Sequence, residues 1–199
     1  IIAGNLTLTS GAAQNGNTPA GYGITDTGDV SVAGDFSATT TGNNGGIIMR
    51  TLEVNGTIAL HTHGTGNGTI ENDDNIDFLT SSVGGNLNAT AEASTITDAT
   101  DAVLTVGGTT TLETEANEAT ITLDTTTNTF TGAVTITTND DSGTDADVTI
   151  DNGTTALILA ASTIDGDLTL TSGNNITDNG TVTVGGNLVA TTDDNSGAI

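Results

Sequence analysis

The chain has 199 residues and a formal net charge of −24, because 25 acidic residues face a single Lys or Arg. Proteins bind phosphate groups mainly through Lys and Arg, so this composition excludes nucleic acid and an anionic membrane surface as expected partners. Cysteine is absent, which excludes disulfides and cysteine-based metal sites. The acidic charge repels itself unless salt or cations screen it, and we therefore expect an extracellular or cell-surface setting.

Alternation of apolar residues with Thr or Ser predicts β-strands along the whole chain. In chain order, the clearest alternating segments are 6–9, 30–32, 120–123, 134–137, 148–150, 168–171 and 181–184. No stretch shows helical periodicity, and no apolar run is long enough to predict membrane insertion. Asn-Gly pairs such as Asn55-Gly56 and Asn152-Gly153 separate the alternating runs and predict turns.

An internal repeat organises these segments. One phrase, an apolar residue, a spacer, Gly, a small polar residue and a strand, begins at Ile2, Val83 and Ile164, so the same 81-residue spacing occurs twice. Each copy is followed by Ile-Thr-Asp, and segments 24–47 and 176–199 align without a gap with 13 of 24 residues identical. The sequence therefore predicts a single segment, 1–199, with super-repeats 2–82, 83–163 and 164–199 (partial), and a loop insertion at 11–23.

The repeat predicts an all-β fold, a parallel, right-handed β-helix or β-solenoid. Four turns fit in each 81-residue unit, which gives coils of about 20 residues by sequence spacing. Inward Leu, Val and Ile would stack between coils, and Asn or Asp at the corners would bridge backbone groups. A pair of immunoglobulin-like sandwiches is the main alternative, although such domains usually bury a Trp or Tyr and pair their strands as hairpins.

The phrases GNLTLTSG, ITDNGTVTVGGNL and LTVGGTTTL resemble the filamentous-haemagglutinin-like and related β-strand-repeat proteins of bacterial surfaces. Those proteins are very long adhesins with right-handed parallel β-helix shafts. The resemblance covers most of the chain and implies a shaft, and it supplies no catalytic residue to carry over.

Candidate metal ligands are confined to acidic turns. The Asp-x-Asn-x-Asp start of a calcium loop occurs at Asp73, Asn75 and Asp77, but Phe78 and Gly84 stand where an EF-hand needs Gly and Glu. Hard oxygen ligands nevertheless favour Ca²⁺ over softer metals. We therefore predict calcium binding of a kind other than the EF-hand in two turns, by Asp73, Asn75, Asp77, Asp140, Asp141, Asp145 and Asp147.

Catalysis is not expected, because no Ser–His–Asp or Gly-x-Ser-x-Gly pattern occurs and Arg50 is the only Lys or Arg. We expect an extracellular structural repeat protein, the shaft or subunit of an adhesin, fibre or filament. Uncapped solenoid ends expose strand edges, so we expect end-to-end self-association or continuation of a longer chain. The alternative is a calcium- or glycan-binding adhesive module of a cell surface, with a host glycan or protein as its partner.

Overall fold

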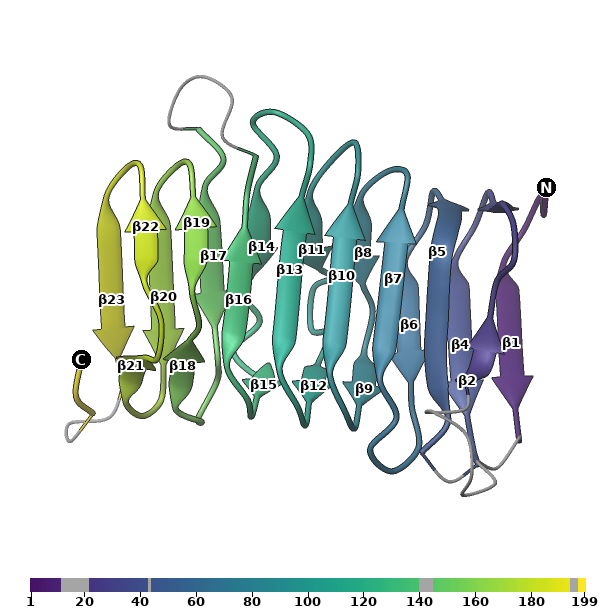
Figure 1. Ribbon diagram of the computed structural model, residues 1–199, viewed down its shortest axis with the longest axis horizontal. Helices are drawn as coiled ribbons and strands as arrows, with labels where there is room; N and C mark the ends of the chain where they lie inside the picture. The colour runs from purple at the N-terminus through teal and green to yellow at the C-terminus, as the bar shows by residue number, and fades with distance from the viewer. Residues whose placement is uncertain (12–21, 43, 140–144, 194–196) are drawn as a thin grey trace.

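The computed structural model describes residues 1–11, 22–42, 44–139, 145–193 and 197–199. All elements within these ranges are β-strands, and all strand pairs are parallel. Figure 1 shows successive coils side by side along the long axis, from the N-terminal end in purple to the C-terminal end in yellow. The predicted all-β parallel solenoid is therefore confirmed.

The strands form two sheets that face each other across the core. The twelve-stranded sheet contains β1 (Leu6–Ser10), β4 (Phe36–Thr40), β6 (Ile58–His61), β8 (Ile76–Phe78), β9 (Ser81–Val83), β11 (Ile96–Asp98), β12 (Leu104–Val106), β14 (Ile121–Leu123), β15 (Thr129–Phe130), β17 (Val148–Asp151), β20 (Leu168–Ser172) and β23 (Leu188–Thr192). The eleven-stranded sheet contains β2 (Tyr22–Thr25), β3 (Val30–Val32), β5 (Gly46–Val54), β7 (Gly68–Asn72), β10 (Leu87–Ala91), β13 (Thr110–Thr114), β16 (Val134–Thr137), β18 (Leu157–Leu159), β19 (Ser162–Ile164), β21 (Ile176–Asp178) and β22 (Val182–Val184).

The chain passes back and forth between the sheets, and most strands pair with the strand one coil further along. Phe36 pairs with Ile58, 22 residues later, and this spacing is typical of the coils. The coil is shorter where Gly68 pairs with Leu87. It is longest where Leu6 pairs with Phe36, because a longer segment intervenes. Neighbouring coils are about 4.8 Å apart along the axis, as in other β-sheets.

The alternation of residues explains the core. Along β10, β13 and β20 every second side chain is buried, because successive side chains of a strand point to opposite faces. The inward residues form one apolar cluster that runs from Ile24 to Ile176. The three phenylalanines, Phe36, Phe78 and Phe130, are almost fully buried within it. Burial of each large apolar side chain stabilises the fold by about 1.5–3 kcal/mol.

The expectation of four turns per super-repeat is wrong, because the unit contains three and a half. From β1 to β10, which start equivalent copies of the phrase, the chain crosses between the sheets seven times. It again crosses seven times from β10 to β20. Several coils are longer than the sequence spacing suggests because their corners are extended. An odd number of half-turns places consecutive copies on opposite sheets: β1 and β20 lie in the twelve-stranded sheet, and β10 lies in the eleven-stranded sheet.

The predicted insertion at 11–23 lies largely outside the described residues, and its last two residues, Tyr22 and Gly23, begin β2. Within the described ranges no helix is long and apolar enough to cross a membrane.

Candidate functional site

Polar side chains at the corners between the two sheets connect successive coils by hydrogen bonds. Asn5 Oδ1 accepts a hydrogen bond from the Asp35 N–H at 3.0 Å, and Asn5 Nδ2 donates to Asp35 Oδ2 at 3.0 Å. Asp35 Oδ1 in turn accepts from both the N–H and the hydroxyl of Thr57, each at 3.0 Å. All three residues follow the glycine of the phrase, so the sequence repeat builds a three-step ladder of side chains, which we call a corner ladder.

Two further corner ladders have the same direction. Asn67 Oδ1 accepts from the Asn86 N–H at 2.8 Å, and Asn86 Oδ1 accepts from the Thr109 N–H at 3.0 Å. The third ladder joins Asp147, Asp167 and Asn187. Asp147 Oδ1 accepts from the Asp167 N–H at 2.7 Å, and Asp167 Oδ1 accepts from the Asn187 N–H at 2.6 Å. In every step a side chain of one coil accepts from the backbone of the next coil, as the stacking prediction for corner Asn and Asp required.

The electrostatics of the first ladder follow from these bonds. The backbone hydrogen bond from Thr57, followed by its hydroxyl bond, lowers the pKa of Asp35 below its ordinary value of 3.8. Hydrogen bonds to a carboxylate favour its charged form. Asp35 is therefore an acceptor at neutral pH, which is the state that the ladder requires.

A second kind of bridge uses the aspartate of Ile-Thr-Asp. Asp26 Oδ2 accepts from the N–H groups of Arg50 and Thr51 at 2.7 and 2.9 Å. The carboxylate of the equivalent Asp98 accepts from two consecutive N–H groups, those of Asp124 and Thr125, each at 3.2 Å. The third copy, Asp178, is exposed, and its side chain makes no hydrogen bond to any described residue. In the two copies that make these bonds, the motif holds the corner of the following coil.

Two buried asparagines form hydrogen bonds with the last residue of a strand in the preceding coil. Asn152 is fully buried; its Oδ1 accepts from the Phe130 N–H at 2.6 Å, and its Nδ2 donates to the Phe130 carbonyl at 3.2 Å. Asn72 makes the same pair of bonds with Val54, at 2.9 and 3.2 Å. In both cases the side-chain amide imitates the backbone of a neighbouring strand and satisfies groups that would otherwise be buried without partners.

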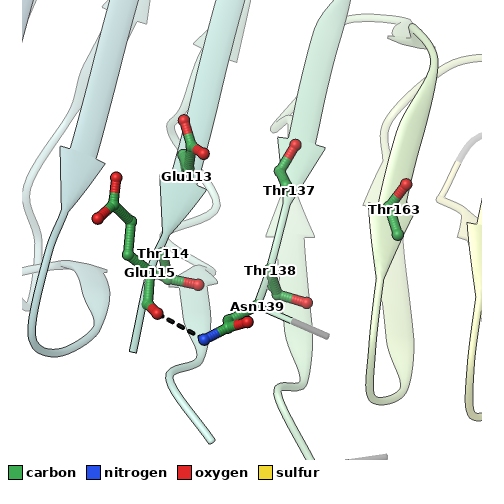
Figure 2. Close-up of a pocket in the computed structure, with 7 residues that line it drawn as sticks. All are labelled: Glu113, Thr114, Glu115, Thr137, Thr138, Asn139 and Thr163. Atoms are coloured by element: carbon green, nitrogen blue, oxygen red, sulfur yellow. Dashed lines mark hydrogen bonds between the residues drawn. The ribbon is translucent and has the colours of Figure 1, made fainter. Parts of the chain in front are cut away.

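An open hollow lies on the outer face of the eleven-stranded sheet (Figure 2). It is lined by Glu113, Thr114, Glu115, Thr137, Thr138, Asn139 and Thr163, which come from β13, β16 and β19 and the residues that follow the first two strands. Asn139 Nδ2 donates to the Glu115 carbonyl at 2.6 Å, the bond drawn as a dashed line in Figure 2. Carboxylates, hydroxyls and an amide suit a cation or a sugar hydroxyl, and the lining contains no basic side chain.

Carboxylates from successive coils also perturb one another. Burial, followed by the negative charges of Asp73, Glu115 and Glu71, raises the pKa of Glu92 above its ordinary value of 4.5. Asp151 behaves similarly. Burial raises its pKa above 3.8, although its bond from the Gly153 N–H acts in the opposite direction. In both cases folding works against the ionised form.

The described residues predicted to bind calcium lie at corners and on the outer face of a strand. Asp73 is exposed at the corner before β8, whereas Asp77 lies on the outer face of β8 and accepts the Thr97 hydroxyl at 3.1 Å. The Asn75 carbonyl accepts from Asn72 Nδ2 at 2.7 Å. Asp147 belongs to a corner ladder, and the exposed Asp145 precedes it.

Asp140 and Asp141 lie outside the described residues. Across the described part of the chain, no group of three or more His, Cys, Asp or Glu side chains is placed to hold a metal ion. Calcium binding remains a prediction.

Comparison with known proteins agrees with the repeat. Residues 65–137 and 145–199 match a family described as repeats of unknown function (DUF5649), which covers more than half of the chain. The chain belongs to this repeat family. No curated protein and no solved structure matches it. The two matched segments include the second and third corner ladders, so the ladder residues Asn67, Asn86 and Asp167 lie inside the region that defines the family.

The sequence analysis identified the repeated phrase but did not identify several residues whose side chains bond to the backbone of a neighbouring coil. Asn152 was interpreted as a turn residue because Gly153 follows it, and Asn72 carried no turn signal. Ser81 and Ser162 both accept the N–H of a core residue, Leu60 and Ile136, at 3.0 Å. These two serines are one super-repeat apart, so comparison of the super-repeats position by position could have identified them.

Proposed function

We propose that this protein is a non-enzymatic structural element, the shaft or a subunit of an extracellular adhesin, fibre or filament. One observation carries the proposal: parallel pairing and a single apolar core continue from β1 to β23. Three side-chain ladders tie corners to the next coil. Such a solenoid is a stiff spacer, because each coil packs on its neighbours through paired strands.

Composition supports a surface location. Arg50 is the only Lys or Arg, so trypsin has a single cleavage site in the chain. The high acidic charge keeps such a rod soluble and prevents non-specific lateral contact.

Immunogold labelling of intact cells of the source organism tests this function. Antibodies raised against the chain are expected to label intact cells and to mark the length of a projecting rod. Label that appears only after the cells are permeabilised would contradict the proposal. Purified chain, examined by small-angle X-ray scattering, provides the matched shape measurement and should give the profile of a rod.

A second candidate, a cation- or glycan-binding adhesive module, is favoured by the hollow in Figure 2. Glu113 and Thr137 face it from neighbouring strands, and their oxygens suit sugar hydroxyls or Ca²⁺. A glycan array compares the chain with its Glu113→Gln variant. Loss of a bound glycan in the variant would support this candidate, and an array without any hit would remove it.

A further inference from the structure

Asp151 is a buried carboxylate with only one of its two oxygens hydrogen-bonded. It ends β17, and only 9% of its surface is exposed. Oδ1 accepts from the Gly153 N–H at 2.7 Å, whereas Oδ2 accepts no hydrogen bond from a described residue. Buried charges in proteins are normally paired with an opposite charge or bound to a metal ion. Arg50, the only Lys or Arg, already bonds to Glu71, so no Lys or Arg is left for Asp151.

The preceding super-repeat contains the same segment, and there the charge of the carboxylate is balanced. Residues 69–72 are Thr-Ile-Glu-Asn and residues 149–152 are Thr-Ile-Asp-Asn. The asparagines that end both segments make the same pair of bonds to the preceding coil, so Glu71 corresponds to Asp151. Arg50 bonds to Glu71 from the preceding coil at 2.7 Å. The carboxylate of Asp151 is the more deeply buried of the two and lacks this partner.

An acidic residue stands where Asp151 would need an arginine. Asp124 and Asp151 directly follow a registered pair of core residues, so they lie beside each other in successive coils. Asp124 thus takes the place that Arg50 has in the earlier segment. Burial raises the pKa of Asp151, and the negative charges of Asp193 and Asp124 raise it further. The surroundings of Asp151 therefore attract a positive charge that the chain itself does not provide.

An open hollow of about 360 Å³ beside Asp151 offers further oxygen ligands. Its lining consists of Thr126, Asp151, Gly153, Thr154, Gly173 and Asp193. Gly173 belongs to the coil between the two acids and has no side chain, which leaves the space between them open. A Cβ at Gly153, where φ is +53°, would lie 2.8 Å from the Thr126 carbonyl oxygen. This oxygen accepts no hydrogen bond from a described residue and is free to bind an ion.

We propose that this hollow binds one Ca²⁺ ion between the carboxylates of Asp151 and Asp193. Carboxylate, hydroxyl and carbonyl oxygens are hard ligands, which favour Ca²⁺ over softer metals. The described chain has no group of three acidic or histidine ligands, so neutral oxygens of the lining and water complete the coordination of about six to eight oxygens. The ion supplies at Asp151 the positive charge that Arg50 supplies at Glu71. It also ties together corners of different coils.

Isothermal titration calorimetry of the full chain with CaCl₂ tests the site after dialysis against a chelator. Salt at about 0.15 M screens general attraction of the ion to the acidic surface. We expect one ion with a dissociation constant of roughly 0.1–1 mM, as in extracellular calcium modules. Asp151→Asn keeps the shape but removes a charged ligand, and it should weaken binding by about tenfold or more.

Two further variants serve as controls for this titration. Asp29→Asn removes an exposed acid at a corner between β2 and β3, and Asp73→Asn alters the calcium turn predicted from the sequence. Both should retain the ion that Asp151→Asn loses. An original chain that takes up no Ca²⁺, or an Asp151→Asn variant that binds as the original does, would overturn the proposal. Binding of Mg²⁺ as tight as that of Ca²⁺ would overturn the assignment of the ion.

A charge placed by mutation tests the comparison with Glu71 independently. Asp124→Arg puts a guanidinium beside Asp151, as Arg50 is placed beside Glu71. It should abolish Ca²⁺ binding and raise the Tm of the chelated chain above that of Asp29→Arg, which makes the same change of net charge. An Asp124→Arg variant that folds and still binds Ca²⁺ as the original does would overturn the proposal, and Asp151→Asn remains decisive if Asp124→Arg does not fold.

The outcome of these titrations is separate from the proposed shaft function. A chain that labels intact cells but binds no Ca²⁺ retains its shaft function and loses the ion site. A chain that binds Ca²⁺ through Asp151 but labels only permeabilised cells retains the ion site and loses the extracellular function.

Discussion

Asparagine has two distinct roles in this protein, and only its environment separates them. At the exposed corners Asn5 and Asn86 accept one hydrogen bond from the next coil, where water could substitute for a lost partner. Asn152 is buried and bonds to both backbone groups of Phe130 and to the Ala156 carbonyl. Buried polar groups without a partner are costly, so the buried amides contribute far more to stability than the exposed ones.

Replacement of Asn152 measures this difference. Asn152→Leu preserves the volume but leaves the Phe130 N–H, the Phe130 carbonyl and the Ala156 carbonyl without this partner. We expect the free energy of unfolding to fall by about 3 kcal/mol, measured by urea denaturation. Asn88→Leu, an exposed substitution on the outer face of β10, is the control and should change it by less than about 0.5 kcal/mol. Equal effects of the two substitutions would contradict the role assigned to Asn152.

Glycine at the corners is required by close packing of backbones. A Cβ at Gly84 would collide with the carbonyl oxygen of Gly64 in the previous coil, whereas a Cβ at Gly28 would meet nothing within 4 Å. We expect Gly84→Ala to destabilise the fold by about 1–3 kcal/mol through overpacking, and Gly28→Ala to be nearly neutral. Thermal unfolding followed by circular dichroism compares the two. A neutral Gly84→Ala variant would show that the corners can move apart.

At the scale of elements, parallel strands place equivalent residues next to one another, which favours apolar stacking and penalises like charges. Ile96 pairs with both Ile76 and Ile121, and all three side chains are fully buried. Glu92 and Glu115 each follow one of two paired strands, and their carboxylates repel each other. Repetition therefore strengthens the core and weakens the acidic corners.

Removal of the charge at Glu92 tests the repulsion. The pKa of Glu92 is raised by folding, so the folded state holds more protons than the unfolded state just above pH 4.5, and stability falls as the pH rises through this range. Glu92→Gln should increase the free energy of unfolding at pH 7 by about 0.5 kcal/mol, the size of a typical cross-strand pair. The difference should disappear below about pH 4.5.

Urea denaturation at several pH values measures this effect, and Glu118→Gln in an exposed turn is the matched control. A Glu92→Gln variant that gains nothing at pH 7, or gains as much at pH 4, would show that repulsion at this corner is negligible. The carboxylate of Asp35 has the opposite pH dependence, because folding lowers its pKa. It stabilises the folded state above about pH 3.8, and this stabilisation is lost as the pH falls further.

Sequence periodicity was sufficient to predict the parallel solenoid, the strand positions and the bridging corners, because each depends on which residues recur. It did not predict the number of coils in each super-repeat. The corners differ in length between coils, as the short coil at Gly68 and the long coil at Leu6 show, while the strand phrases stay the same. The general expectation that Asn or Asp at the corners bridges backbone groups also covers Asp26 and Asp98, but the sequence did not indicate that these two residues each accept from two consecutive N–H groups.

At the scale of the whole molecule, net charge opposes folding. Arg50 bonds to Glu71 at 2.7 Å and is the only Lys or Arg available to 25 acidic residues. The remaining repulsion extends over roughly 30 Å at 0.01 M salt but only about 8 Å at 0.15 M. The folded rod concentrates this charge more than the unfolded chain does, so screening should favour the folded state.

Salt titration tests this, and it also tests the predicted calcium binding. We expect Tm to rise between about 0.01 and 0.15 M NaCl, by about 2–4 °C for each kcal/mol of repulsion removed. CaCl₂ at equal ionic strength should raise Tm further if Asp73, Asn75 and Asp77 or the turn with Asp145 and Asp147 binds the ion. Asp73→Asn and Asp145→Asn should then reduce that additional rise. Identical curves for the two salts would contradict the calcium prediction, and a Tm independent of NaCl would contradict the repulsion.

The odd number of half-turns per super-repeat has a consequence for anything that approaches the rod from the side. A partner that recognises one surface motif of the unit meets it on one flank, and the next copy is turned away on the opposite flank. On a single flank the motif returns only after two units, which is seven coils or about 34 Å along the axis. A longer array of such units would therefore offer two equal and opposite rows of sites, suited to bridging two neighbours rather than to concentrating ligands on one side.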